Sequence, residues 1–126
     1  MDKKDIEKYL VDVKAALSDD RYRIERNANR QDNVDLFLKY AINLTRAKKI
    51  ILSLKADDFS QVTRNKHKGY EKELLYIFGK DVKLLERIGN KEKLVHLYIK
   101  INKLDDGFVI IISFHEQKRP LKYYFK

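Results

Sequence analysis

The 126-residue chain contains no cysteine, no tryptophan, one proline and four glycines. The absence of cysteine excludes disulfides and thiolate metal sites. The glycines do not cluster, so the chain has no glycine-rich loop that could cradle phosphates. No apolar run reaches the length of a membrane span, and the first ten residues lack the apolar core of a signal peptide. We therefore expect a single domain over residues 1–126, soluble and cytoplasmic, with no membrane partner.

Positive charge is distributed unevenly along the chain. The formal net charge is +9; residues 1–35 hold eight Lys and Arg against nine Asp and Glu, whereas residues 36–126 hold twenty against ten. Residues 117–126 carry four cations and no acid. A field of this sign attracts polyanions such as nucleic acid, or an acidic protein. Charge alone is explained equally well by ordinary solubilising lysine.

The hydrophobic pattern changes from helical to strand-like after residue 59. Apolar spacings of three and four residues predict a helix over 5–17, a second over 34–41 after a turn-rich connection, and a third capped by Thr45. The polar stretch 60–73 has no periodicity and is predicted to be a loop. Strands are predicted over residues 74–79, 82–88, 94–101, 108–115 and 121–125. Helices first and strands later predict an α+β fold, with N-terminal helices packed on one face of a mostly antiparallel sheet.

The sequence LDDG at 104–107 predicts a hairpin between the last two long strands. Asp-Gly favours a two-residue turn centred on Asp106 and Gly107. Counting outward from that turn gives one face with the pairs Lys103–Ile110, Ile101–Ile112 and Ile99–Phe114. The opposite face has the pairs Lys100–Ser113 and Tyr98–His115. A slip of one residue would mix polar and apolar side chains on both faces. A slip of two residues would keep the faces and place Tyr98 beside Ser113, so either register leaves Tyr98 and His115 on one face.

The hairpin therefore gathers Tyr98, Lys100 and His115 on the face away from the core. An imidazole exchanges protons near neutral pH, a phenol donates a hydrogen bond, and an ammonium stabilises negative charge. These are the groups needed to cleave RNA without a metal, through attack of the ribose 2′-hydroxyl on the adjacent phosphorus. On the residues alone, a structural His–Tyr pair remains an open alternative. His67 and His96 are expected to be ordinary loop and strand residues.

Five segments together resemble the MqsR family of toxins, which cleave messenger RNA and belong to type II toxin–antitoxin pairs. They are LKADDF (54–59), YIFGK (76–80), LYIKI (97–101), IIISFH (110–115) and PLKYYF (120–125). Their order and spacing carry the resemblance, which runs from about residue 30 to the end. It implies a RelE-like ribonuclease fold and a metal-independent endoribonuclease (an mRNA interferase) that leaves a 2′,3′-cyclic phosphate. It also implies a cognate antitoxin as partner, with DNA contacted only through the antitoxin complex.

The resemblance also implies roles for individual residues. The family's strand tyrosine falls on Tyr98, and its catalytic position after Ser-Phe falls on His115, where some members have lysine. A family lysine falls on Gln61, so Lys80, or Arg64 and Lys66, would supply the missing charge. The family glutamine has no counterpart at Gly79.

The expected site therefore has a catalytic group and an RNA-binding group. The catalytic residues are His115, Tyr98 and Lys80. The RNA-binding residues are Lys100, Gln61, Arg64, Lys66, Lys118 and Arg119. No cofactor and no metal are expected. A non-catalytic module that binds nucleic acid, or one that binds only an antitoxin, remains an alternative.

Overall fold

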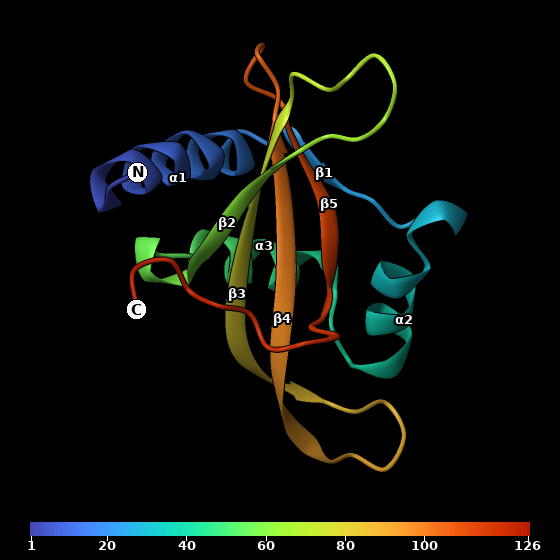
Figure 1. Cartoon of the computed structure of the whole chain (residues 1–126). Coiled ribbons are helices and arrows are strands. Elements are labelled where there is room, and N and C mark those ends of the chain that lie inside the picture. Colours follow the sequence, from blue (N-terminus) through green and yellow to red (C-terminus); the bar gives the residue numbers. More distant parts are fainter.

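A five-stranded sheet forms the centre of the protein (Figure 1). The computed structural model describes residues 1–126. The strand order is β1-β5-β4-β3-β2, with β1 parallel to β5 and every other pair antiparallel. The strands are β1 (Tyr22–Ile24), β2 (Phe59–Arg64), β3 (Leu74–Leu85), β4 (Glu92–Lys103) and β5 (Val109–Glu116). The helices are α1 (Lys3–Ser18), α2 (Gln31–Lys39) and α3 (Leu44–Leu52), with 3-10 turns η1 (Ala28–Arg30) and η2 (Ala56–Asp58). The predicted α+β class and mostly antiparallel sheet are confirmed.

Helices α1 and α3 cover one face of the sheet, which we call the back face (Figure 1). The predicted apolar stripe of α1 is buried in the core. This helix begins two residues earlier than predicted, because Asp2 and Asp5 form a reciprocal capping box. Helix α3 is capped by Asn43 rather than by Thr45, since the Asn43 side chain accepts a hydrogen bond from the backbone N–H of Arg46 at 2.8 Å.

Helix α2 lies against the part of β5 that β1 leaves unpaired. Strand β1 pairs only with residues 109–111 of β5. Beyond them, the buried side chain of Asn33 donates to the carbonyl oxygen of Ile112 at 2.9 Å and accepts from the backbone N–H of Phe114 at 2.8 Å. Asn33 therefore supplies the hydrogen bonds that a neighbouring strand would otherwise make.

Several element boundaries differ from the prediction. The segment 60–73, predicted as a loop, contains most of β2. The alternation of polar and apolar side chains is hard to recognise there, because this edge strand is short and mostly polar. The predicted strands 74–79 and 82–88 form one continuous strand, β3. Strand β1 was not predicted, and residues 121–125 form no strand. Helix α2 begins at Gln31 instead of residue 34.

The turn between β4 and β5 is one residue longer than predicted. The N–H of Leu104 donates to the carbonyl oxygen of Phe108 at 2.8 Å, and the N–H of Gly107 donates to the carbonyl oxygen of Leu104 at 3.0 Å. The φ angle of Gly107 is +90°, as expected for the left-handed residue that ends a three-residue turn. The first pairs are consequently shifted by one residue, to Lys103–Val109, Asn102–Ile110 and Ile101–Ile111.

A β-bulge at Ile112 then restores the predicted register. The register shifts between Lys100 and Ile101, and the pairs beyond it are Lys100–Ser113, Ile99–Phe114 and Tyr98–His115. Ile112 is the extra residue on β5. It lines a groove together with Tyr98 and Lys100, so the prediction that it faces Ile101 in the core was wrong.

The other face of the sheet, which we call the front face, carries Tyr98 and His115 and is crossed by the C-terminal tail, residues 117–126 (Figure 1). The tail is held by Ser60, whose hydroxyl donates to the carbonyl oxygen of Lys122 at 2.6 Å. A Cβ at position 79 would clash with the Tyr123 hydroxyl, so Gly79 allows the tail to cross close to β3. None of the helices combines the length and the apolar character needed to cross a membrane.

Candidate active site

Tyr98 and His115 form a stacked pair on the front face. They are directly opposite on β4 and β5, their ring centroids are 5.2 Å apart, and their planes differ by 11°. The prediction that both side chains lie on one face of neighbouring antiparallel strands is confirmed. Direct cross-strand contact and ring stacking fix the position of the imidazole relative to the phenol.

The contacts of His115 determine which ring nitrogen can exchange protons. Its Nδ1 lies 2.8 Å from the carbonyl oxygen of Glu116. A carbonyl oxygen only accepts hydrogen bonds, so Nδ1 carries the proton and donates it. In the neutral imidazole, Nε2 is then unprotonated and has no hydrogen-bond partner in the protein. The ring is therefore oriented as a base whose accepting nitrogen is available to a ligand.

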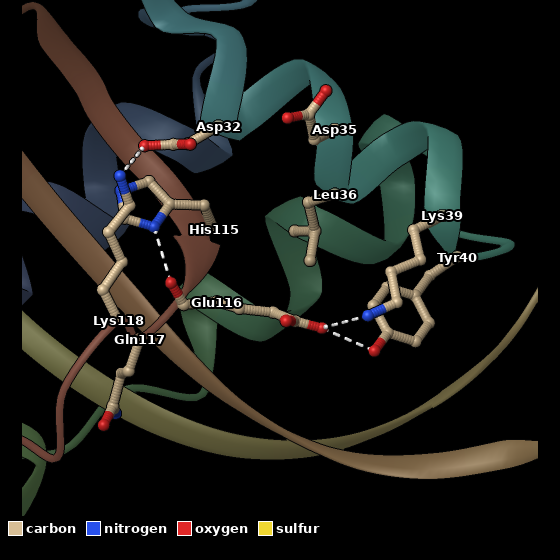
Figure 2. A pocket seen from close by; sticks show the side chains of 9 residues that line it. All are labelled: Asp32, Asp35, Leu36, Lys39, Tyr40, His115, Glu116, Gln117 and Lys118. Carbon is tan, nitrogen blue, oxygen red and sulfur yellow. Dashed lines mark hydrogen bonds and ion pairs between the residues drawn. The ribbon is translucent and has the colours of Figure 1, made fainter.

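The side chain of Glu116 is itself anchored beside His115 (Figure 2). The hydroxyl of the buried Tyr40 donates to Glu116 Oε1 at 2.5 Å, and Lys39 Nζ lies 3.5 Å from the same oxygen. Burial and the neighbouring Glu116 carboxylate raise the pKa of Tyr40, so its hydroxyl stays protonated and remains a donor. These contacts hold the residue whose carbonyl oxygen orients the imidazole.

Burial raises the pKa of the half-buried Tyr98, so its hydroxyl is protonated at neutral pH. It can therefore donate a hydrogen bond or a proton, whereas His115 can accept one. The ammonium of Lys100 lies 5.8 Å from the centroid of the Tyr98 ring. Burial, followed by the positive charges of Arg30 and Lys66, lowers the pKa of Lys100. The three side chains combine an acceptor, a donor and a cation, which is what proton transfer at a phosphate requires.

All six predicted RNA-binding residues line two adjoining hollows on the front face. Gln61, Arg64 and Lys66 line one hollow, and Lys118 and Arg119 line the other, together with His115. Tyr98 and Lys100 belong to both hollows and form the boundary between them. The predicted set is thus brought onto one continuous surface.

Lys118 is the one member of this set that is already paired with a carboxylate (Figure 2). Its Nζ lies 2.8 Å from Asp32 Oδ2, and the hydrogen bond from Lys118 lowers the pKa of Asp32. Asp32 is the second residue of α2, so it joins the start of that helix to the tail. A phosphate that contacted Lys118 would compete with this carboxylate.

Lys80 does not belong to the site. Its Nζ contacts Asp58 Oδ2 at 3.1 Å and the carbonyl oxygen of Ser53 at 3.3 Å. The prediction that Lys80 is a catalytic residue was wrong, because β3 runs through this position without a break. Gly79 pairs with Tyr98 and faces the front, so the next residue, Lys80, faces the back.

Four residues of the site were not predicted from the sequence: Arg30, Asp32, Tyr40 and Glu116. The first two come from the turn-rich segment 27–33, and Tyr40 directly follows α2. These segments reach the site only through contacts with β5 that are distant in sequence. Glu116 follows His115 directly, but its role depends on Tyr40, 76 residues away.

No group of three or more His, Cys, Asp or Glu side chains is placed so that it could hold a metal ion. Comparisons of the chain with protein-family models, with curated proteins and with solved structures found no match. The RelE-like character of the fold and the relationship to the MqsR family therefore stay predictions from the sequence resemblance.

Proposed function

We propose that the protein is an endoribonuclease that cleaves RNA through its own 2′-hydroxyl and does not use a metal ion. The observation that carries the proposal is the stacked Tyr98–His115 pair, with Nε2 of His115 unpartnered and Lys100 beside it. The surrounding cations would hold the RNA backbone.

Each step of the proposed cleavage uses one of these side chains. Nε2 of His115 accepts the 2′-hydroxyl proton as the 2′-oxygen attacks phosphorus. The bond between phosphorus and the 5′-oxygen breaks, and that oxygen takes its proton from the hydroxyl of Tyr98. The Lys100 ammonium stabilises the charge that develops on the phosphoryl oxygens. His115 then loses its proton to solvent and Tyr98 regains one, so the products are a 2′,3′-cyclic phosphate and a 5′-hydroxyl.

The sequence resemblance alone supports the cellular setting. In that setting the protein is the toxin of a type II pair, cleaves messenger RNA, and is held inactive by an acidic antitoxin. The alternative is a module that binds RNA on the same cations without cutting it. The contacts of His115 favour catalysis, because binding alone does not need an imidazole with one nitrogen oriented and the other unpartnered.

The direct test is to incubate the purified protein with single-stranded RNA in excess chelator and to identify the ends of the products. We expect cleavage with 2′,3′-cyclic phosphate ends and no cleavage of DNA. The change His115→Ala should lower the rate by about 10²–10⁴, the usual value of a positioned base. Tyr98→Phe should lower it less, because the ring still stacks. Undiminished cleavage by His115→Ala would exclude the assigned chemistry, and binding without cleavage would favour the alternative.

A further inference from the structure

A groove of about 340 Å³ lies beside the Tyr98–His115 pair on the front face, between β2 and the centre of the sheet. Its floor is apolar, its rim is cationic, and none of its lining residues is a carboxylate. It adjoins the hollow that contains His115, with Tyr98 and Lys100 common to both. A ligand in the groove would therefore lie next to one bound at the imidazole.

The floor consists of Leu75, Ile77 and Ile112. All three are buried, yet they do not belong to the main core on the back face. Ile112 reaches the floor only because of the β-bulge in β5. A floor of aliphatic side chains gives the flat face of a nucleobase an apolar surface to lie on.

The rim carries four cations without acidic partners, of which Arg64 donates to the backbone carbonyl oxygen of Glu71 at 3.5 Å. Arg30, Lys66 and Lys100 line the groove and make no ion pair or side-chain hydrogen bond in the protein. Their mutual repulsion is one cause of the lowered pKa of Lys100. An anion in the groove would relieve that repulsion. A phosphate is the expected anion, because the adjoining hollow is proposed to bind the RNA backbone.

Two uncharged side chains project from β2 into the same groove. Gln61 and Thr63 alternate along the strand, so both face the front, and neither makes a side-chain hydrogen bond within the protein. A primary amide offers two donors and an acceptor in one plane, an arrangement that can pair with the edge of a base. Gln61 therefore has the chemistry for recognition, and its hydrogen-bonding groups are free.

We propose that this groove binds one nucleotide of the RNA next to the scissile phosphate and selects its base through Gln61. The base lies on the aliphatic floor, the Gln61 amide bonds its edge, and Arg30, Lys66 and Lys100 hold its phosphate. The proposal rests on the proposed function for the identity of the ligand as RNA. It assigns sequence preference to Gln61 and general affinity to the cations.

Binding can be tested without cleavage by using fluorescein-labelled 2′-O-methyl hexauridine in which one central base is A, C, G or U. Fluorescence anisotropy should show one base preferred, on the order of tenfold, because a paired amide discriminates among base edges. The change Gln61→Leu should abolish the preference. Since Gln61 is exposed on an edge strand, this variant should keep the melting temperature of the wild type.

Removing a cation from the groove should change RNA affinity in a different way from removing Gln61. Lys100→Met should weaken binding of all four oligonucleotides by a similar factor and leave the preference intact. The matched control is Lys8→Met, which removes an exposed, unpaired cation from α1 on the back face and should leave affinity unchanged within about twofold.

Equal affinity for the four bases, or a preference that survives Gln61→Leu, would overturn the proposal. So would unchanged RNA affinity in Lys100→Met, which would leave the groove to an acidic protein segment. These results are distinguishable from failure of the proposed function. Base preference that depends on Gln61 supports the groove even when the protein does not cut RNA, and cleavage through His115 without base preference overturns the groove alone.

Discussion

The hydroxyl of Tyr40 donates to the carboxylate of Glu116 at 2.5 Å, and the main-chain carbonyl oxygen of the same glutamate orients the imidazole of His115. Tyr40 is only 2% exposed, and we assign it as a positioning residue in the proposed site, because its hydroxyl is bonded to Glu116 and acts on His115 through that residue. Its effect would pass through the end of β5, where Glu116 is the last residue of the strand.

We expect Tyr40→Phe to make the orientation of the His115 imidazole less well defined without unfolding the protein. The loss of a hydrogen bond to a charged group should lower the free energy of unfolding by about 1–3 kcal/mol. The ¹⁵N chemical shifts of His115 should show a smaller share of the tautomer protonated at Nδ1, and the cleavage rate should fall with it. Lys39→Met, which removes a longer contact to the same oxygen, is the control and should change both readings less. An unchanged tautomer in Tyr40→Phe would restrict Tyr40 to a structural role.

The amide of Asn33 should be required for the placement of α2. It donates to two carbonyl oxygens, of Glu25 and Ile112, and accepts from the N–H of Phe114. Asn33→Leu leaves these buried backbone groups without partners and should lower the free energy of unfolding by about 2–4 kcal/mol in urea denaturation. Asn33→Asp keeps the acceptor and loses the donor, so it should also destabilise the protein. A loss below about 0.5 kcal/mol in Asn33→Leu would show that water replaces the amide.

The pairing of Tyr98 with His115 could be predicted from the sequence, although two details behind it could not. The side-chain alternation on both strands fixes which face each residue occupies. The LDDG turn has three residues instead of two, and the bulge at Ile112 compensates for the shift. Asp-Gly is compatible with both turn lengths, and nothing in the run of three isoleucines marks where a bulge occurs.

Residues outside regular alternation could not be placed from the sequence. Lys80 was predicted to be catalytic as a substitute for a family lysine, and its face could not be derived because the predicted strands left it between them, whereas β3 is continuous through this position. Arg30 and Asn33 lie in a polar segment without periodicity, and only their long-range contacts with β5 and the groove reveal their roles. Packing between segments that are distant in sequence determined these positions, and it cannot be predicted from the local pattern of polar and apolar residues.

The charged side chain of Lys100 is expected to lower the free energy of unfolding of the protein without RNA. Its pKa is lowered from the ordinary value of 10.5, so the unfolded chain holds the proton to higher pH than the folded protein does. The charged ammonium therefore destabilises the fold at neutral pH, and this cost falls as the pH rises through the lowered pKa toward 10.5. We expect Lys100→Met to melt at a higher temperature than the wild type at pH 7, with the difference decreasing in alkaline buffer. A difference independent of pH would assign the gain to packing instead of charge.

Asp32 holds Lys118 in an ion pair, and its removal should strengthen RNA binding. In Asp32→Asn, Lys118 becomes free to contact a phosphate, so affinity for single-stranded RNA should rise. The slope of log affinity against log salt should steepen by about 0.7, the value for one added phosphate contact on a single strand. The change also removes a favourable charge from the first turn of α2, which should cost about 0.3–1 kcal/mol of stability.

The matched control is Asp35→Asn on the same helix. It changes the net charge equally, but Asp35 accepts a hydrogen bond from Gln31 and pairs with no cation. Its salt slope should stay at the wild-type value, because no phosphate-binding cation is released. Equal slopes in the two variants would show that RNA senses only the overall charge near α2, whereas a steeper slope in Asp32→Asn alone would place a phosphate at Lys118, beside the imidazole of His115.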